Sequence, residues 1–157
     1  LVGGAEVELE FPVLDLVVVG QLQLGGERPA GLGAEAFQRT DFLVAQETFH
    51  FGDLEGAPWP LAGERFDAVV VTNYLWRPLW PQLLAALAEG GVLIYETFMQ
   101  GNERFGKPSN PQFLLGRGEL WAAFGHRLAV RAFEQGYQGS PKPAMIQRLC
   151  AMEARFQ

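Results

Sequence analysis

Polar side chains follow two apolar segments of this sequence, at the points where each segment ends. Asn73 and Tyr74 come directly after a β-branched run, and Glu96 stands near the end of a second apolar run. An amide, a phenol or a carboxylate can hold a polar ligand, and a carboxylate can also take a proton from a reacting group. Open α/β sheets bind ligands at the carboxyl ends of their strands. We therefore expect one crevice to collect the polar residues at such ends: Asp53, Asn73, Tyr74, Glu96 and Thr97.

Each of these residues also has a structural interpretation. Asp53 can cap a turn, and Asn73 can cap a helix. Tyr74 can pack in the core, and Glu96 can anchor the long loop that follows it. The residue types alone leave both interpretations open.

A strand–helix–strand unit is needed to position these residues. Residues 68–72 form a short apolar run bounded by polar residues, which predicts a strand buried on both faces. Leucines at positions 79, 83, 84 and 87 recur with helical spacing, and Gly90 is a natural end for that helix. Residues 91–98 predict the second strand. Such a unit implies a right-handed crossover and parallel pairing.

The chain beyond this unit predicts a functional loop and a hairpin. Residues 99–117 form a long polar connection, and a loop of this length inside a compact domain is usually functional. Residues 118–124 predict a short helix. Residues 128–134 and 144–153 predict two strands separated by glycine and proline, and hence a terminal antiparallel hairpin.

The upstream part has weaker patterns. Residues 6–11 alternate between acidic and apolar side chains, which indicates a half-buried strand, and residues 13–19 are a second apolar run. Residues 48–51 predict another strand, and residues 34–42 are a weak helical candidate.

The composition is that of an ordinary folded domain. The chain has 157 residues and a net charge of −6, with 48% hydrophobic and 19% charged residues, which disfavours disorder and general nucleic-acid binding. One cysteine excludes a disulfide framework and a cysteine-rich zinc site, and two histidines disfavour a histidine-based metal site. The apolar runs are far shorter than a membrane span. We expect one cytoplasmic domain without a metal, a nucleic-acid partner or a membrane partner.

The charge is distributed unevenly along the chain. Residues 1–60 hold ten acids and two bases, a net of −8, whereas residues 61–157 hold eight acids and ten bases, a net of +2. No methionine precedes Met99. The sequence therefore predicts a chain that is processed, truncated or incompletely known.

The second half of the chain resembles a known family. Residues 66–74 and 87–98, in their order and spacing, look like the second half of class I S-adenosylmethionine-dependent methyltransferases. The resemblance covers about residues 53–153. Within this range, three further segments of the chain are similar to a bacterial subgroup near the tellurite-resistance type: 101–106, 113–115 and 118–120.

This resemblance implies an α/β fold. The expected architecture is a Rossmann-like, mostly parallel sheet with helices on both faces and a C-terminal antiparallel hairpin. We expect a single methyltransferase-like domain over residues 1–157. Within it, residues 53–157 are the family-like half and residues 1–52 are an atypical or incomplete cofactor half.

The resemblance also implies a site for S-adenosylmethionine and a small-molecule acceptor. Asp53 would accept a hydrogen bond from the adenine amino group, and Leu54 would pack on the ring. The backbone of Thr72 would serve the amino group of the ligand, and Asn73 and Tyr74 would lie beside its methionine part and the transferred methyl. Glu96 is a candidate base beside Tyr74. Trp76 and Arg77 are candidates for the substrate pocket. The lid over it would consist of Asn102, Glu103, Arg104 and Phe105.

The sequence departs from the family at the glycine-rich cofactor turn. Residues 13–16 resemble the first strand of the family, in which a Gly-x-Gly turn begins four residues after the aspartate. Here Asp15 is followed by glycines at 20, 25 and 26, so Asp15 and Gly20 are the nearest candidates for cofactor contacts. Glycines at that turn allow the backbone to approach the ligand closely. Three hypotheses fit: the turn has diverged, the cofactor half has been replaced, or residues 16–52 contain a sequence error.

Two functions are compatible with these patterns. The first is methyl transfer from S-adenosylmethionine to a small molecule. The second is a non-catalytic methyltransferase-like remnant that acts as a scaffold or an oligomerisation module, for example in a homodimer. A dinucleotide-dependent oxidoreductase fits less well, because no Gly-x-Gly-x-x-Gly turn is present.

Overall fold

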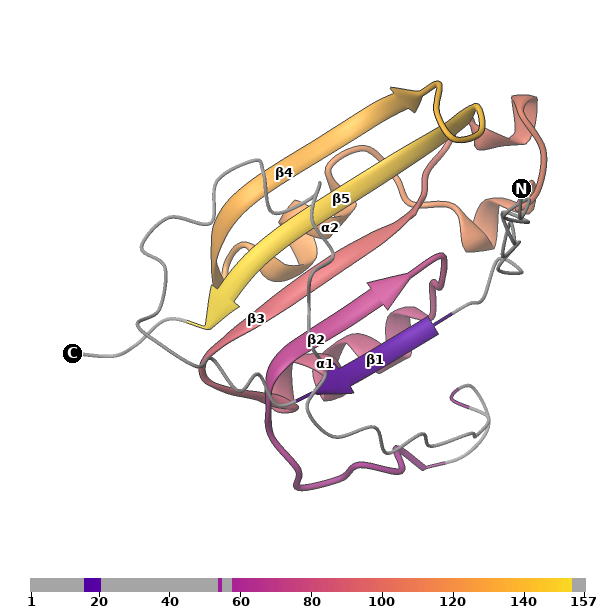
Figure 1. The fold of residues 1–157 in the computed structure, drawn as a ribbon. Coiled ribbons are helices and arrows are strands. Elements are labelled where there is room, and N and C mark those ends of the chain that lie inside the picture. The colour runs from indigo at the N-terminus through magenta and orange to yellow at the C-terminus, as the bar shows by residue number, and fades with distance from the viewer. Residues whose placement is uncertain (1–15, 21–53, 55–57, 154–157) are drawn as a thin grey trace, which may run out of the picture.

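The computed structural model describes residues 16–20, 54 and 58–153, and of residues 16–20 it describes the backbone alone. The described strands form one sheet in the order β1-β2-β3-β5-β4 (Figure 1). The strands are β1 (Leu16–Gly20), β2 (Phe66–Thr72), β3 (Leu87–Phe98), β4 (Leu128–Gln138) and β5 (Ala144–Glu153). The helices are α1 (Trp80–Ala85) and α2 (Glu119–Phe124), with 3₁₀ turns at Arg77–Leu79, Asn102–Arg104 and Pro111–Phe113.

The strand–helix–strand unit is confirmed, but its helix is shorter than predicted. β2 and β3 are parallel, and α1 connects them. The helix ends at Ala85 instead of Gly90, because Leu87 already pairs with Phe66 at the start of β3.

Two glycines allow the tight passage from α1 into β3. Gly90 has a φ of 70°, a left-handed conformation that favours glycine. A Cβ atom at Gly91 would lie 2.8 Å from the carbonyl oxygen of Ala88 and 2.9 Å from that of Phe66. Gly90 therefore shapes an irregular strand entry and does not end the helix.

The prediction of a mostly parallel sheet is wrong for the described strands. β2–β3 is the one parallel pair, and β1–β2, β3–β5 and β4–β5 are antiparallel. The terminal hairpin is confirmed, and β5 lies between β3 and β4 (Figure 1). The short connection after β4 reverses the chain, so β5 pairs with both neighbours in the antiparallel sense.

The described helices lie on one face of the sheet, so the prediction of helices on both faces is not confirmed. Figure 1 shows α1 and α2 behind the sheet. Val71 of β2, Tyr95 of β3 and Leu149 of β5 form one buried cluster with Leu83 of α1 and Phe124 of α2. The rings of Tyr95 and Phe124 lie 6.0 Å apart. This face holds the core that positions the strand ends.

The connection between β3 and α2 is ordered. Met99 and Leu115 form a parallel bridge, and the amide of Leu115 donates to the carbonyl oxygen of Phe98 at 3.0 Å. The loop therefore returns to the carboxyl end of β3 before α2 begins.

Some expectations lie outside the described residues: the strands at 6–11 and 48–51, the helix at 34–42, and the sites at Asp15 and Asp53. The run at 13–19 corresponds in part to β1. In the described part of the chain, no helix is long and apolar enough to cross a membrane.

Candidate functional site

The carboxyl ends of β2 and β3 lie side by side, as the strand–helix–strand pattern predicts. Thr72 is the register partner of Glu96, and the amide of Asn73 donates to the carbonyl oxygen of Glu96 at 2.9 Å. Asn73 has a φ of 55°, a left-handed conformation that asparagine tolerates better than most residues. It is not a helix cap, because the following 3₁₀ turn begins after Trp76. Asn73 therefore turns the chain sharply at the edge where a ligand is expected.

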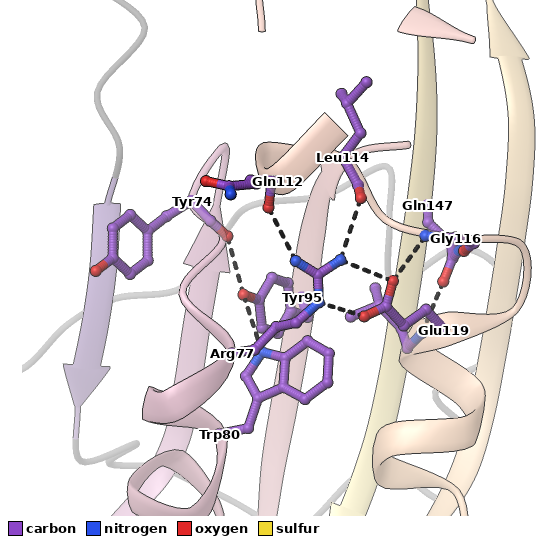
Figure 2. Close-up of polar contacts among 10 residues, drawn as sticks. Tyr74, Arg77, Trp80, Tyr95, Gln112, Leu114, Gly116, Glu119 and Gln147 are labelled. Carbon is purple, nitrogen blue, oxygen red and sulfur yellow. Dashed lines mark hydrogen bonds and ion pairs between the residues drawn. The ribbon is translucent and has the colours of Figure 1, made fainter. Parts of the chain in front are cut away.

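The backbone of Tyr74 is held by a buried tyrosine of the next strand. The hydroxyl of Tyr95 donates to the carbonyl oxygen of Tyr74 at 2.9 Å and accepts a hydrogen bond from Nε1 of Trp80 at 3.4 Å. Burial raises the pKa of Tyr95 to about 12, so its hydroxyl keeps its proton at neutral pH. The Tyr74 ring points away from the Arg77 guanidinium (Figure 2).

Arg77 joins the loop after β2 to the segment that leads into α2. Its Nε donates to Oε1 of Glu119 at 2.5 Å, and its Nη2 donates to Oε2 at 3.0 Å (Figure 2). The guanidinium also donates to the carbonyl oxygens of Gln112, at 2.9 Å, and Leu114, at 3.1 Å. A guanidinium has five N–H groups, and these contacts occupy four of them. The predicted substrate contact of Arg77 is untested, and the structure gives this side chain a structural role.

Charge and hydrogen bonding both stabilise the ion pair of Arg77 and Glu119. Burial opposes ionisation of Glu119, but the hydrogen bonds from Arg77 and from the amide of Gly116 outweigh it and lower the pKa of the carboxyl. The hydrogen bond to Glu119 raises the pKa of Arg77 against the opposing effect of burial. Both groups are therefore charged over the whole neutral range.

A buried glutamine continues the polar network into the sheet. Gln147 of β5 is 0% exposed. Its Oε1 accepts from the amide of Leu120 at 2.7 Å, and its Nε2 donates to the carbonyl oxygen of Gly116 at 2.8 Å. The side-chain oxygen of Gln135 accepts from the amide of Gly118 at 2.8 Å.

The sequence patterns assign no site role to Glu119, Gln135 or Gln147. The alternation of residues along β5 could have indicated Gln147, because it places this amide on the same inward face as Leu149 and Ala151. An amide at an inward strand position must find partners there.

Glu96 is held by a cation of the neighbouring strand. Nε of Arg148 donates to Oε2 of Glu96 at 2.5 Å, and Nη1 lies 3.3 Å from Oε2 of Glu134 on β4. Arg148 also donates to Gln138. The register places Glu96, Arg148 and Glu134 directly opposite one another across β3, β5 and β4. The loop-anchoring alternative for Glu96 is not what the structure shows, since the carboxylate ties β3 to β5, and its role as a base is untested.

In the predicted lid, Asn102 is buried and hydrogen-bonded, whereas Glu103 and Arg104 are exposed. Asn102 is 2% exposed, its Nδ2 donates to the carbonyl oxygen of Pro108 at 3.2 Å, and its Oδ1 accepts from the amide of Met145 at 3.1 Å. Asn102 therefore holds the loop against β5, which leaves it poorly placed for substrate. Glu103 and Arg104 are exposed and bond to the backbone of Gly101, so their substrate contact stays a prediction.

Leu54 and Trp76 are both partly buried and pack against the hydrophobic core. Trp76 therefore contributes to the packing of the core. The stacking of Leu54 on an adenine ring and the placing of Trp76 in a substrate pocket are untested.

Gly20 lies away from the cofactor candidates at the carboxyl end of β2. Because β1 runs antiparallel to β2, Gly20 pairs with Ala68, and it is Leu16 that pairs with Thr72. Four residues of strand separate the two positions by about 13 Å at the usual rise of a strand. Gly20 thus lies toward the amino end of β2, away from Asn73. The antiparallel pairing of β1 with β2 differs from the expectation of a mostly parallel sheet.

The described residues include no candidate metal centre. Among them, no group of three or more histidine, cysteine, aspartate or glutamate side chains is placed to hold a metal ion. Cys150 is buried, and this burial raises the pKa of its thiol against the opposing charge of Arg131.

Comparisons with known proteins give little further information. No protein-family model matches the chain, and no curated protein matches it. One solved structure to which it is similar is that of TehB from Haemophilus influenzae, with 14% identity and a TM-score of 0.46. The similarity covers 58% of this chain and 36% of that chain. At this TM-score the likeness adds no argument about fold or activity, and the architecture rests on the described mixed α/β sheet itself.

Proposed function

We propose that this chain is a methyltransferase-like domain that binds S-adenosylmethionine and transfers its methyl group to a small-molecule acceptor. The observation that carries the proposal is the contact between the ends of β2 and β3, where the amide of Asn73 meets the carbonyl oxygen of Glu96. This edge of an open α/β sheet is where ligands bind. The unit β2–α1–β3 and the hairpin β4–β5 also agree with the family resemblance.

The described residues fit the cofactor at one strand and not at another. Thr72 and Asn73 stand at the ligand edge and would hold its methionine part. Gly20 stands toward the opposite end of the β1–β2 pair and does not fit a cofactor turn. The proposal therefore places binding on β2 and on Asp53, and gives Gly20 no part in it.

The chemistry asks little of the protein beyond geometry. S-adenosylmethionine supplies a methyl group already activated by a sulfonium. The residues around it have to hold the acceptor in line with the carbon–sulfur bond, and such positioning can supply much of the rate enhancement. A base is needed only for a protonated acceptor. In this proposal Tyr74 borders the transferred methyl and Glu96 is the candidate base.

Isothermal titration calorimetry on the sequence-verified full chain tests the proposal. S-adenosylhomocysteine, the product form, is expected to bind saturably, with a dissociation constant below about 1 mM. Asp53→Ala should weaken this binding more than Glu103→Ala, because Asp53 would contact the cofactor and Glu103 the acceptor. Equal and negligible effects of the two substitutions would count against the proposed crevice.

A second candidate function is a non-catalytic scaffold. It is favoured by the antiparallel β1, which takes Gly20 away from the ligand edge, and by the ion pair that holds Glu96. A protein that unfolds cooperatively but gives no heat with either form of the cofactor would support this candidate. For the protein itself, three further predictions remain: a cytoplasmic location, the lack of nucleic-acid and membrane partners, and a homodimeric state.

A further inference from the structure

The described hydrogen-bond partners of the Arg77 guanidinium lie on one short segment far along the chain. Glu119 is 42 residues away, and the carbonyl oxygens of Gln112 and Leu114 precede it on the same segment. One side chain thus contacts residues 112–119 at three separate places. A planar guanidinium can make these contacts together, because its N–H groups form a rigid fork. A lysine ammonium in the same place lacks this fork.

The far side of the same segment is fixed to the sheet. Gln147 bonds to the backbone of Gly116 and Leu120, and Gln135 accepts from the amide of Gly118. Residues 112–120 therefore lie between Arg77 and the strands β4 and β5, and they have little freedom to follow Arg77 if it moves.

The loop at residues 73–76 is held at both of its ends. At its start, the amide of Asn73 and the carbonyl oxygen of Tyr74 bond to Glu96 and Tyr95 of β3. At its end, Arg77 bonds to Glu119. Removing the second attachment would leave the bonds to β3 and the packing of Leu75 and Trp76 against the core.

We propose that Arg77 is a positioning residue that fixes the loop at residues 73–76 against the segment at residues 112–119 through Glu119. The two parts then move as one unit at the carboxyl edge of β2. The effect of this coupling on ligand affinity rests on the proposed function, because the loop at residues 73–76 would contact the cofactor. The mechanical coupling between the two parts does not depend on that function.

Amide hydrogen exchange on the full chain tests the coupling in both directions. Glu119→Gln should speed exchange of the Leu79 amide, which bonds to Trp76 in the turn that starts at Arg77, by about three- to tenfold. Arg77→Lys should speed exchange of the Gly116 and Gly118 amides by a similar factor, about three- to tenfold. Each effect crosses from the substituted segment to the other one.

Two matched substitutions serve as controls. Glu134→Gln removes an acid from an ion pair with Arg148, and Arg65→Lys removes a guanidinium that donates to the carbonyl oxygen of Leu87. Neither should change exchange at Leu79 or Gly116. The change in the free energy of global unfolding of each variant is measured by urea denaturation and its effect on exchange is subtracted. After this correction the amides of the β3–β5 ladder should keep their exchange rates in all four variants. A rise that stays uniform across the protein after the correction, or no effect of Glu119→Gln at Leu79, would overturn the inference.

The affinity for S-adenosylhomocysteine gives a second readout. Glu119→Gln should raise its dissociation constant by about three- to tenfold, while Glu134→Gln leaves it unchanged. Binding that is unchanged in Glu119→Gln would contradict the positioning role. If the unmodified protein binds no S-adenosylhomocysteine but the exchange effects occur, the coupling stands and the proposed function fails.

Discussion

Glu96 and Arg148 stand directly opposite each other on β3 and β5, and Nε of Arg148 donates to Oε2 of Glu96 at 2.5 Å. The carboxylate that the sequence marks as a candidate base is thus the partner of a cross-strand cation. Arg148 also lies 3.3 Å from Glu134 on the next strand. This arrangement links three strands on the face opposite to the Tyr95 core.

Replacing Arg148 should destabilise the sheet more than replacing either of its acidic partners. Arg148→Met leaves Glu96 and Glu134 facing an apolar side chain, and we expect a loss of about 1–2 kcal/mol in the free energy of unfolding. Glu134→Gln should cost less than about 0.5 kcal/mol, because this side chain is more than half exposed. Urea unfolding measures both values. Equal costs would show that Arg148 is not central to the arrangement.

The ion pair of Arg77 and Glu119 should make stability depend on pH. The pKa of Glu119 in the folded protein is lowered from its ordinary value of 4.5, so the folded state binds the proton less well than the unfolded state. The resulting stabilisation is present above pH 4.5 and is lost as the pH falls through the lowered pKa.

Comparing the native protein with Glu119→Gln isolates this contribution. The difference in unfolding free energy should be about 1 kcal/mol at pH 7 and should shrink below the ordinary carboxyl pKa. Urea unfolding between neutral pH and about pH 3 measures it. A difference that does not change with pH would contradict the electrostatic role of Glu119.

The buried amide of Gln147 should be hard to replace by an apolar side chain. Gln147→Leu removes the partners of the Leu120 amide and the Gly116 carbonyl oxygen, and we expect a loss of about 1–3 kcal/mol. Gln112→Leu is the matched control, since the side chain of Gln112 is exposed and its change should cost little. Thermal and urea unfolding give the comparison. A stable Gln147→Leu protein would show that the network is dispensable.

A methyl group at Gly91 should disrupt the entry into β3. Gly91→Ala would place Cβ within 2.9 Å of two carbonyl oxygens, so the backbone must shift, and we expect a cost of about 1–3 kcal/mol. Gly139→Ala is the control, because its nearest contact is 3.5 Å from the oxygen of Tyr137. Equal stability of the two variants would contradict the close approach described here.

The β2–α1–β3 unit and the hairpin could be predicted from local patterns. The β-branched run before Asn73, the leucine spacing of α1 and the glycine and proline residues after β4 each act over a few residues. They also placed Asn73 beside Glu96, because parallel strands end at the same edge.

The direction of β1 and the role of Arg77 could not be predicted in this way. A run such as Leu16–Gly20 has the same pattern in either direction, and its pairing with β2 is a long-range contact. Arg77 and Glu119 are 42 residues apart, and no local spacing connects them. Gln147 was detectable as an amide on an inward strand face, but its partners depend on where α2 packs.

A nuclear magnetic resonance titration of the isotope-labelled full chain with S-adenosylhomocysteine tests the central claim most directly, because it shows both whether a ligand binds and where. We predict saturable shifts of the backbone amides of Thr72, Asn73 and Tyr74 and of Thr97, with Ala68 at the other end of β2 unaffected. A folded protein whose spectrum does not change at any ligand concentration, or one whose shifts avoid the ends of β2 and β3, would contradict the account.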